Sequence, residues 1–213
     1  MPKSGLGRFA GPTYAALLLC KSVLALKGLS TVWKHSRGVL ELRALELPQA
    51  KNWLYAYVLL QLPDEIKALL DRNHISAHLH HLVTGFGYML DAEFGSPRTQ
   101  AFAVMGLAAE VVAPFYQIHY MLKGNGKAGS VLARLSVLSI IAVTATIRAP
   151  IELMMAVLGT RDCVLYFRGA GGEVRDQLQP MLIIPSVAGC CFMMYLDFQW
   201  VFYWALPKVR KRV

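Results

Sequence analysis

The residues best suited to chemistry are histidines in one short apolar segment. His74, His78 and His81 are spaced by four and then three residues, which returns them to the same face of a helix, and His80 adjoins His81. Imidazoles act as general bases or as metal ligands. The chain has only 6 histidines, fewer than the boxes of di-iron desaturases need. We therefore predict no metal at His80 or His81 and no cofactor, and interpret the cluster as polar residues at an interface or a water-filled mouth.

Charged residues inside apolar runs form the second candidate set. Arg148 and Glu152 are four residues apart, so they can pair on one helix face. Asp197 has no partner within reach along its own segment and must find one on another helix or become neutral. A charge at the bilayer centre costs about 2.5–3.5 kcal/mol on insertion scales, so each needs a partner or a function. A structural ion pair is the simpler interpretation of Arg148 and Glu152, and contact with a ligand head group is the alternative.

The composition indicates that a membrane surrounds these side chains. The 213-residue chain is 55% hydrophobic and only 16% charged, against roughly 25% charged in soluble domains. Its net charge is +9, but the basic residues flank apolar runs and do not follow one face, so we predict no nucleic-acid partner. The four cysteines have no metal-binding spacing and are interpreted as small core residues.

Six apolar segments must position the candidate residues, and the fold class expected is an all-α bundle of about six transmembrane helices. Each span needs about 20 apolar residues. The predicted spans are about Phe9–Leu29, Asn52–Leu70, Ser76–Leu90, Thr99–Leu122, Val131–Leu158 and Met181–Leu206. Lys21 lies near the middle of the first span, and Pro63 interrupts the second. A tight turn near Asn73 makes the second and third helices antiparallel neighbours, and the longest connection is expected at Gly159–Gln179.

The chain divides into residues 1–51, a basic segment with the first span and a loop, residues 52–208, the main transmembrane domain, and residues 209–213, a basic tail. The loop charges place both termini on one side, in the cytosol or matrix. No acid precedes Glu41, and a basic, acid-free start is typical of mitochondrial transit segments. This pattern favours the mitochondrial inner membrane over the endoplasmic reticulum.

Short motifs follow one another in an order that resembles a known family. An aromatic-led helix carries an acid, and the helix after it contains paired histidines. The motifs are Tyr55, Tyr57 and Asp64, then His80-His81-Leu82-Val83, Glu110-Val111-Val112-Ala113-Pro114-Phe115 and Arg148-Ala149-Pro150. Over Asn52–Lys208 the chain resembles the TLC domain family, which includes ceramide synthases and TRAM-type translocon proteins. The resemblance implies about six helices around a central polar cavity that admits an acyl chain, and it carries functional roles to His80, His81, Glu110, Pro114 and Arg148.

One departure from the family pattern concerns catalysis. Ceramide synthases have a second catalytic segment with a histidine and paired aspartates, whereas this chain has Gly106-Leu107-Ala108-Ala109-Glu110 there. The chain therefore resembles the non-synthase branch, in which a glutamate precedes Pro-Phe. With no catalytic residues expected, we predict that the lipid-binding or cavity-lining residues are His78, His81, Glu110, Arg148, Glu152 and Asp197.

Three functions follow from these patterns. The first is a non-catalytic membrane protein that binds lipids or serves as an accessory subunit of a larger membrane-protein complex. The small residues Gly106, Ala108 and Ala109 are candidates for close contact with a neighbouring chain. The second is an acyl-CoA-dependent lipid acyltransferase that uses His80 or His81, and the third is a transporter that uses the charged interior.

Overall fold

The computed structural model describes residues 10–70 and 75–210, and these residues form helices and no strands. The α-helices are α1 (Ala10–Leu40), α2 (Ala50–Leu70), α3 (Ile75–Phe94), α4 (Pro97–Gly106), α5 (Ala113–Gly124), α6 (Val131–Val143), α7 (Ala149–Phe167), α8 (Pro180–Gln199) and α9 (Leu206–Arg210). Shorter elements continue them: the 3₁₀ helix η2 (Leu107–Val112) joins α4 to α5, the π-helical turns η3 (Thr144–Arg148) and η5 (Trp200–Ala205) join α6 to α7 and α8 to α9, and the 3₁₀ helix η4 (Gly172–Gln177) precedes α8.

Four of the resulting helical stretches are long and apolar enough to cross a membrane, as an integral membrane protein requires. In the described part of the chain they are Ala15–Leu40, Pro97–Gly124, Val131–Phe167 and Pro180–Ala205. The other two predicted spans form the helices α2 and α3, which do not reach the same combination of length and hydropathy. Polar side chains explain this, because α2 carries Asp64 and Glu65 and α3 carries several histidines.

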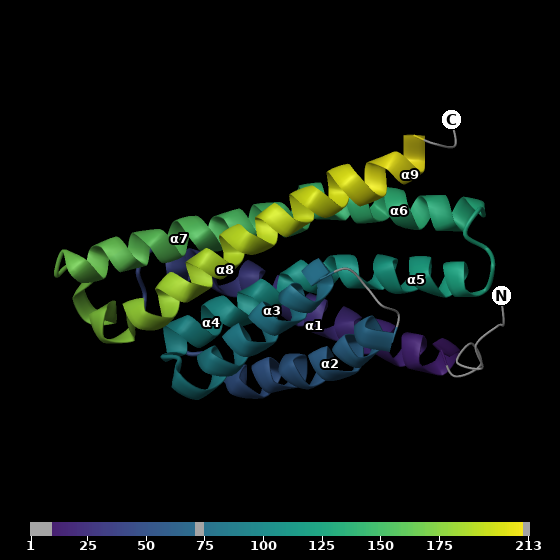
Figure 1. Ribbon diagram of the computed structural model, residues 1–213. Coiled ribbons are helices and arrows are strands. Elements are labelled where there is room, and N and C mark those ends of the chain that lie inside the picture. The colour runs from purple at the N-terminus through teal and green to yellow at the C-terminus, as the bar shows by residue number, and fades with distance from the viewer. Residues whose placement is uncertain (1–9, 71–74, 211–213) are drawn as a thin grey trace.

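The helical stretches run up and down, so that neighbours along the chain are antiparallel (Figure 1). The start of α1 and the end of α9 lie at the end of the bundle that also contains the α5–α6 connection. The α3–α4 turn and the α7–α8 connection lie at the opposite end. The location of both termini in the cytosol or matrix stays a prediction. The tight turn predicted near Asn73 falls outside the described residues.

Two helices extend further than the apolar runs predict. α1 continues to Leu40, so His35 is helical and not in a loop, and α7 continues to Phe167 into the predicted connection. The longer α1 is explained by its inner face, where Val39 is fully buried. Pro63 also differs from expectation, because α2 continues through it.

Two arginines donate hydrogen bonds to the last backbone carbonyls of α1. Arg98 is fully buried, donates from Nε to Asp162 Oδ2 at 2.7 Å, and donates from Nη2 to the carbonyl of Val39 at 3.1 Å. Arg161 also donates to the carbonyl of Val39, at 2.7 Å, and to that of Leu40, at 3.2 Å. The last carbonyls of a helix lack partners inside it, and these guanidinium groups satisfy them. Asp162 is thus a buried structural residue, although its sequence position suggested a loop.

Small residues bring α1 and η2 into direct backbone contact. Gly28 on α1 lies so close to η2 that a Cβ atom there would fall on the backbone of Leu107 and Ala108. A Cβ atom at Gly106 would instead meet side-chain atoms, the hydroxyl of Tyr88 and the end of Met155. Gly106 and Ala108 are buried within this chain, so the expectation that they contact a neighbouring chain is wrong. Ala109 instead lines an internal cavity.

Candidate functional site

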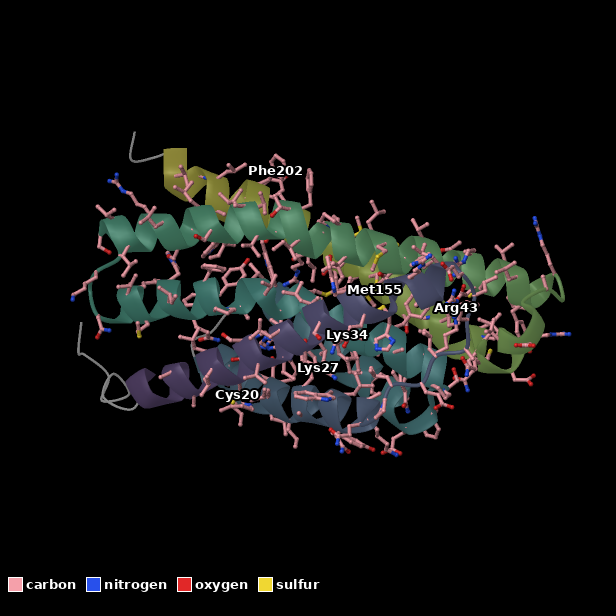
Figure 2. All side chains as sticks on the ribbon, turned by 180° about the vertical axis from the view of Figure 1, so that it is seen from behind. Cys20, Lys27, Lys34, Arg43, Met155 and Phe202 are labelled. Atoms are coloured by element: carbon pink, nitrogen blue, oxygen red, sulfur yellow. The ribbon has the colours of Figure 1, made fainter. Side chains whose placement is uncertain are left out.

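A cavity of about 400 Å³ lies between α3, α4, η2, α7 and α8. Its walls are mainly apolar and include Val83, Leu90, Phe102, Met155 and Ile183. Met155 on α7, labelled in Figure 2, belongs to this interior wall. The polar lining residues include Tyr57, His80, Asp91, Glu110, Arg148 and Glu152. An apolar chamber with a few converging polar groups has the usual character of a ligand site.

The first group of interior charges is centred on Lys21 of α1. Its ammonium group contacts the Asp64 carboxylate of α2 and lies 3.6 Å from Glu110 Oε2 of η2. The hydroxyl of Tyr57 donates a hydrogen bond to Glu110 Oε1 at 3.0 Å. All four residues are buried. The cost of a lysine in the middle of an apolar helix is therefore offset by two carboxylates on other helices.

The second group is centred on Arg148, the last residue of the π-helical turn η3. Its Nε atom lies 3.1 Å from Glu152 Oε1, which confirms the predicted pair. The same atom lies 2.6 Å from Asp197 Oδ2 on α8, so Asp197 has the cross-helix partner that it requires. Pro150 follows the π turn and has no backbone N–H, which interrupts the regular helical ladder at this point.

Acids outnumber cations across these two groups. Lys21 and Arg148 face four carboxylates, those of Asp64, Glu110, Glu152 and Asp197. Within the described part of the chain, Glu152 Oε2 is buried and has no hydrogen-bond partner. Since Glu152 lines the cavity, the chamber has an acceptor that the protein itself leaves unused. Such a buried acceptor costs free energy unless something else donates to it.

The paired histidines point to different neighbours. His80 is buried, lines the cavity, and has its Nδ1 atom 3.2 Å from the sulfur of Met193. His78 and His81 instead place their Nδ1 atoms 2.6 Å and 2.8 Å from the two carboxylate oxygens of Glu65 on α2. The structure thus brings Glu65 into the cluster, a contact that no sequence pattern predicted.

Three of the predicted cavity residues are in the cavity wall and three are not. Glu110, Arg148 and Glu152 line it, whereas His78, His81 and Asp197 do not. The two histidines lie outside this wall because the helical stripe that they share faces Glu65 of α2, and lipid binding by them stays a prediction. Asp197 does not line the cavity but contacts Arg148, which does. His74, the first residue of the stripe, lies outside the described residues.

The two features that a catalytic histidine requires, a carboxylate partner and a place in the cavity wall, occur on different histidines. General base catalysis requires the base within hydrogen-bond reach of the reacting proton, and a carboxylate commonly orients the imidazole. His81 has such a carboxylate but does not line the cavity, and His80 lines the cavity but meets a thioether. No group of three or more metal-ligating side chains occurs in the described residues. The absence of a metal at His80 and His81 stays a prediction.

The chain matches no family model, no curated protein and no solved structure. The geometry of the cavity and its charges is therefore the basis for a function.

Proposed function

We propose that this chain is a non-catalytic, TLC-like membrane protein with six spans that binds a membrane lipid in its interior cavity. We further propose that it is an accessory subunit of a larger complex, in the mitochondrial inner membrane in preference to the endoplasmic reticulum. The basic, acid-free start of the chain supports that location. The observation that carries the lipid-binding proposal is the apolar cavity with a few charged groups in its wall.

The size and lining of the cavity support a lipid. Its volume of about 400 Å³ lies within the roughly 300–1,000 Å³ range of ligand pockets. Apolar side chains such as Phe102 and Ile183 give a hydrocarbon chain a favourable environment, and the charged side chains of the wall give a head group polar partners. A catalytic histidine would need both a place in the cavity wall and a carboxylate that orients it. His80 lines the cavity and His81 has the carboxylate partner. This separation supports binding without turnover.

Filling the cavity should remove the bound lipid. A Cβ atom at Gly189, a cavity residue on α8, would meet no atom within 4 Å, so Gly189→Leu adds its side chain to free space. We expect the purified wild-type protein to retain about one lipid molecule per chain and the variant to retain much less. Lipid extraction from protein in mild detergent, followed by mass spectrometry, measures this. Gly124→Leu is the matched control, because Gly124 is exposed, has no atom near its Cβ and does not line the cavity.

Equal lipid retention in Gly189→Leu and Gly124→Leu would contradict lipid binding in this cavity. A melting temperature for both variants, measured in the same detergent, shows whether a loss of lipid reflects occupied space or a loss of fold.

The second candidate function is acyl transfer, which the position of His80 in the cavity wall favours. It is tested by supplying the purified protein with acyl-CoA and a long-chain amine. We expect no product above the level of protein-free vesicles. Product formation that disappears in His80→Ala, but persists in His35→Ala on α1, would replace the binding function with the acyltransferase.

A further inference from the structure

The seam between α3 and α8, the line along which the two helices adjoin, is bridged by contacts at two positions along the helices. At one level, His80 Nδ1 of α3 lies 3.2 Å from the Met193 sulfur of α8. At the other, Gln179, which precedes α8, donates from its side-chain amide to the carbonyl of Phe94 at the end of α3, at 3.2 Å. The cavity lies beside the portion of the seam between these two bridges.

Between the bridges, four residues open the cavity to the side of the bundle. Phe86 and Gly87 of α3 and Pro185 and Gly189 of α8 line the cavity, and we refer to them as the α3–α8 window. Phe86 is 55% exposed and Pro185 is also exposed, although both belong to the cavity wall. The two glycines leave free space, because a Cβ atom on either would meet nothing within 4 Å. A wall residue that is also at the surface marks the mouth of a cavity.

The surface around the window is apolar. Leu82 of α3 and Ile184 of α8 are 67% and 50% exposed, and α8 lies in one of the stretches able to cross a membrane. Exposed leucine and isoleucine side chains on a membrane-crossing helix face hydrocarbon. The window therefore opens toward lipid tails and not toward water.

The charges beyond the window select among head groups. The cavity wall carries the carboxyl groups of Asp91, Glu110 and Glu152. Its guanidinium group, on Arg148, is already paired with two carboxylates. A carboxylate or phosphate head group would meet like charge here, which is costly in a desolvated site. A hydroxyl or ammonium group would instead supply the donor that Glu152 Oε2 lacks.

We propose that a single-chain amphiphile enters this cavity from the bilayer through the α3–α8 window and is held at Glu152 by a head group that donates hydrogen bonds and carries no negative charge. The cavity volume of about 400 Å³ is near the lower end of the roughly 300–1,000 Å³ range for ligand pockets, which suits one chain and not two. The inference rests on the proposed lipid binding and adds the head-group class and the route of entry.

The head group is tested with three ligands of equal chain length: hexadecylamine, hexadecanol and sodium palmitate. Their affinities for the purified protein in detergent are measured by native mass spectrometry. We expect the amine and the alcohol to bind at least about tenfold more tightly than palmitate, and tenfold corresponds to about 1.4 kcal/mol. In Glu152→Gln the ratio of amine to palmitate affinity should fall by at least about tenfold. Glu173→Gln, an exposed position in η4, should leave the ratio unchanged.

The outcomes separate this inference from the proposed function. Palmitate binding as tightly as the amine, or an affinity ratio that Glu152→Gln does not change, would overturn the head-group assignment while lipid binding stands. Failure of all three ligands to bind, together with no retained lipid after purification, would overturn both.

The route is tested with a hexadecylamine analogue that carries a photoreactive diazirine near the end of its chain. In vesicles, the reacted peptides should contain residues 86–87 or 185–189 of the window. Crosslinks confined to the α5–α6 end of the bundle would overturn lateral entry at this seam. Gly87→Leu, which places a side chain in the window, should sharply reduce the crosslinked fraction at short exposure to the ligand. An unchanged fraction would contradict entry at this seam.

Discussion

Replacing Arg148 by methionine should destabilise the bundle more than any other single change of a charged residue in the cavity wall. Arg148 neutralises both Glu152 and Asp197, and all three side chains are buried. Removing one partner of a buried ion pair costs about 3–5 kcal/mol, and here two carboxylates lose their cation together. We therefore expect loss of the monodisperse protein, or a large fall in melting temperature, in detergent. Arg134→Met, on the exposed side of α6, is the matched control.

Neutralising the acids together with the arginine should restore stability. The triple change Arg148→Met, Glu152→Gln, Asp197→Asn removes every charge of the group, so no charge stays buried alone. Equal instability of the single and triple variants would mean that these charges are not coupled. The sequence alone suggests a two-member pair, for which Glu152→Ala would isolate Arg148. Because Asp197 also contacts Arg148, loss of Glu152 alone should be milder than loss of the arginine.

Placing leucine at Gly28 should separate α1 from η2. A Cβ atom there would fall on the backbone of Leu107 and Ala108, and backbone atoms cannot turn aside as a side chain can. α1 must then move away, which also draws Lys21 away from Glu110. We expect a loss of at least about 3 kcal/mol, the upper end of the usual cost of overpacking. Melting in detergent and the fraction of monodisperse protein after size exclusion report this loss.

Gly124→Leu provides the comparison for Gly28→Leu, since a Cβ atom at Gly124 has no neighbour within 4 Å. Its melting temperature should match that of the wild type. An unchanged melting temperature in Gly28→Leu as well would show that α1 and η2 are further apart than the structure places them.

The sequence predicts the helices well because the signal for them is local. Apolar runs locate the helical stretches, and a spacing of four residues identifies Arg148 and Glu152 as a pair. The end of α1 is predicted less well, because Val39 and the arginines that satisfy its carbonyl come from packing between distant segments. Hydropathy supports four membrane crossings, and the polar residues of α2 and α3 are the reason that it does not identify six.

The site is harder to predict because its contacts cross between helices. A helical stripe correctly groups His78 with His81, but only the packing of α2 shows that this stripe meets Glu65. His80, one residue away, faces α8 and the cavity. Lys21 and Asp64 are 43 positions apart along the chain, yet their side chains are in contact. The one sequence signal for this contact is that each is a charged residue in an apolar run.

The burial of Lys21 also constrains how the chain enters a bilayer during synthesis. α1 is translated before α2 and η2, and Lys21 has no acid to pair with inside α1, which carries no glutamate or aspartate. Until α2 supplies Asp64 and η2 supplies Glu110, Lys21 of an isolated α1 lies unneutralised in an apolar stretch, at a cost of up to about 2.5–3.5 kcal/mol, the value for a lysine at the bilayer centre. α1 thus depends on α2 and η2 for stable insertion, so α1 should remain beside the insertion machinery until residues as distant as Glu110 have been translated.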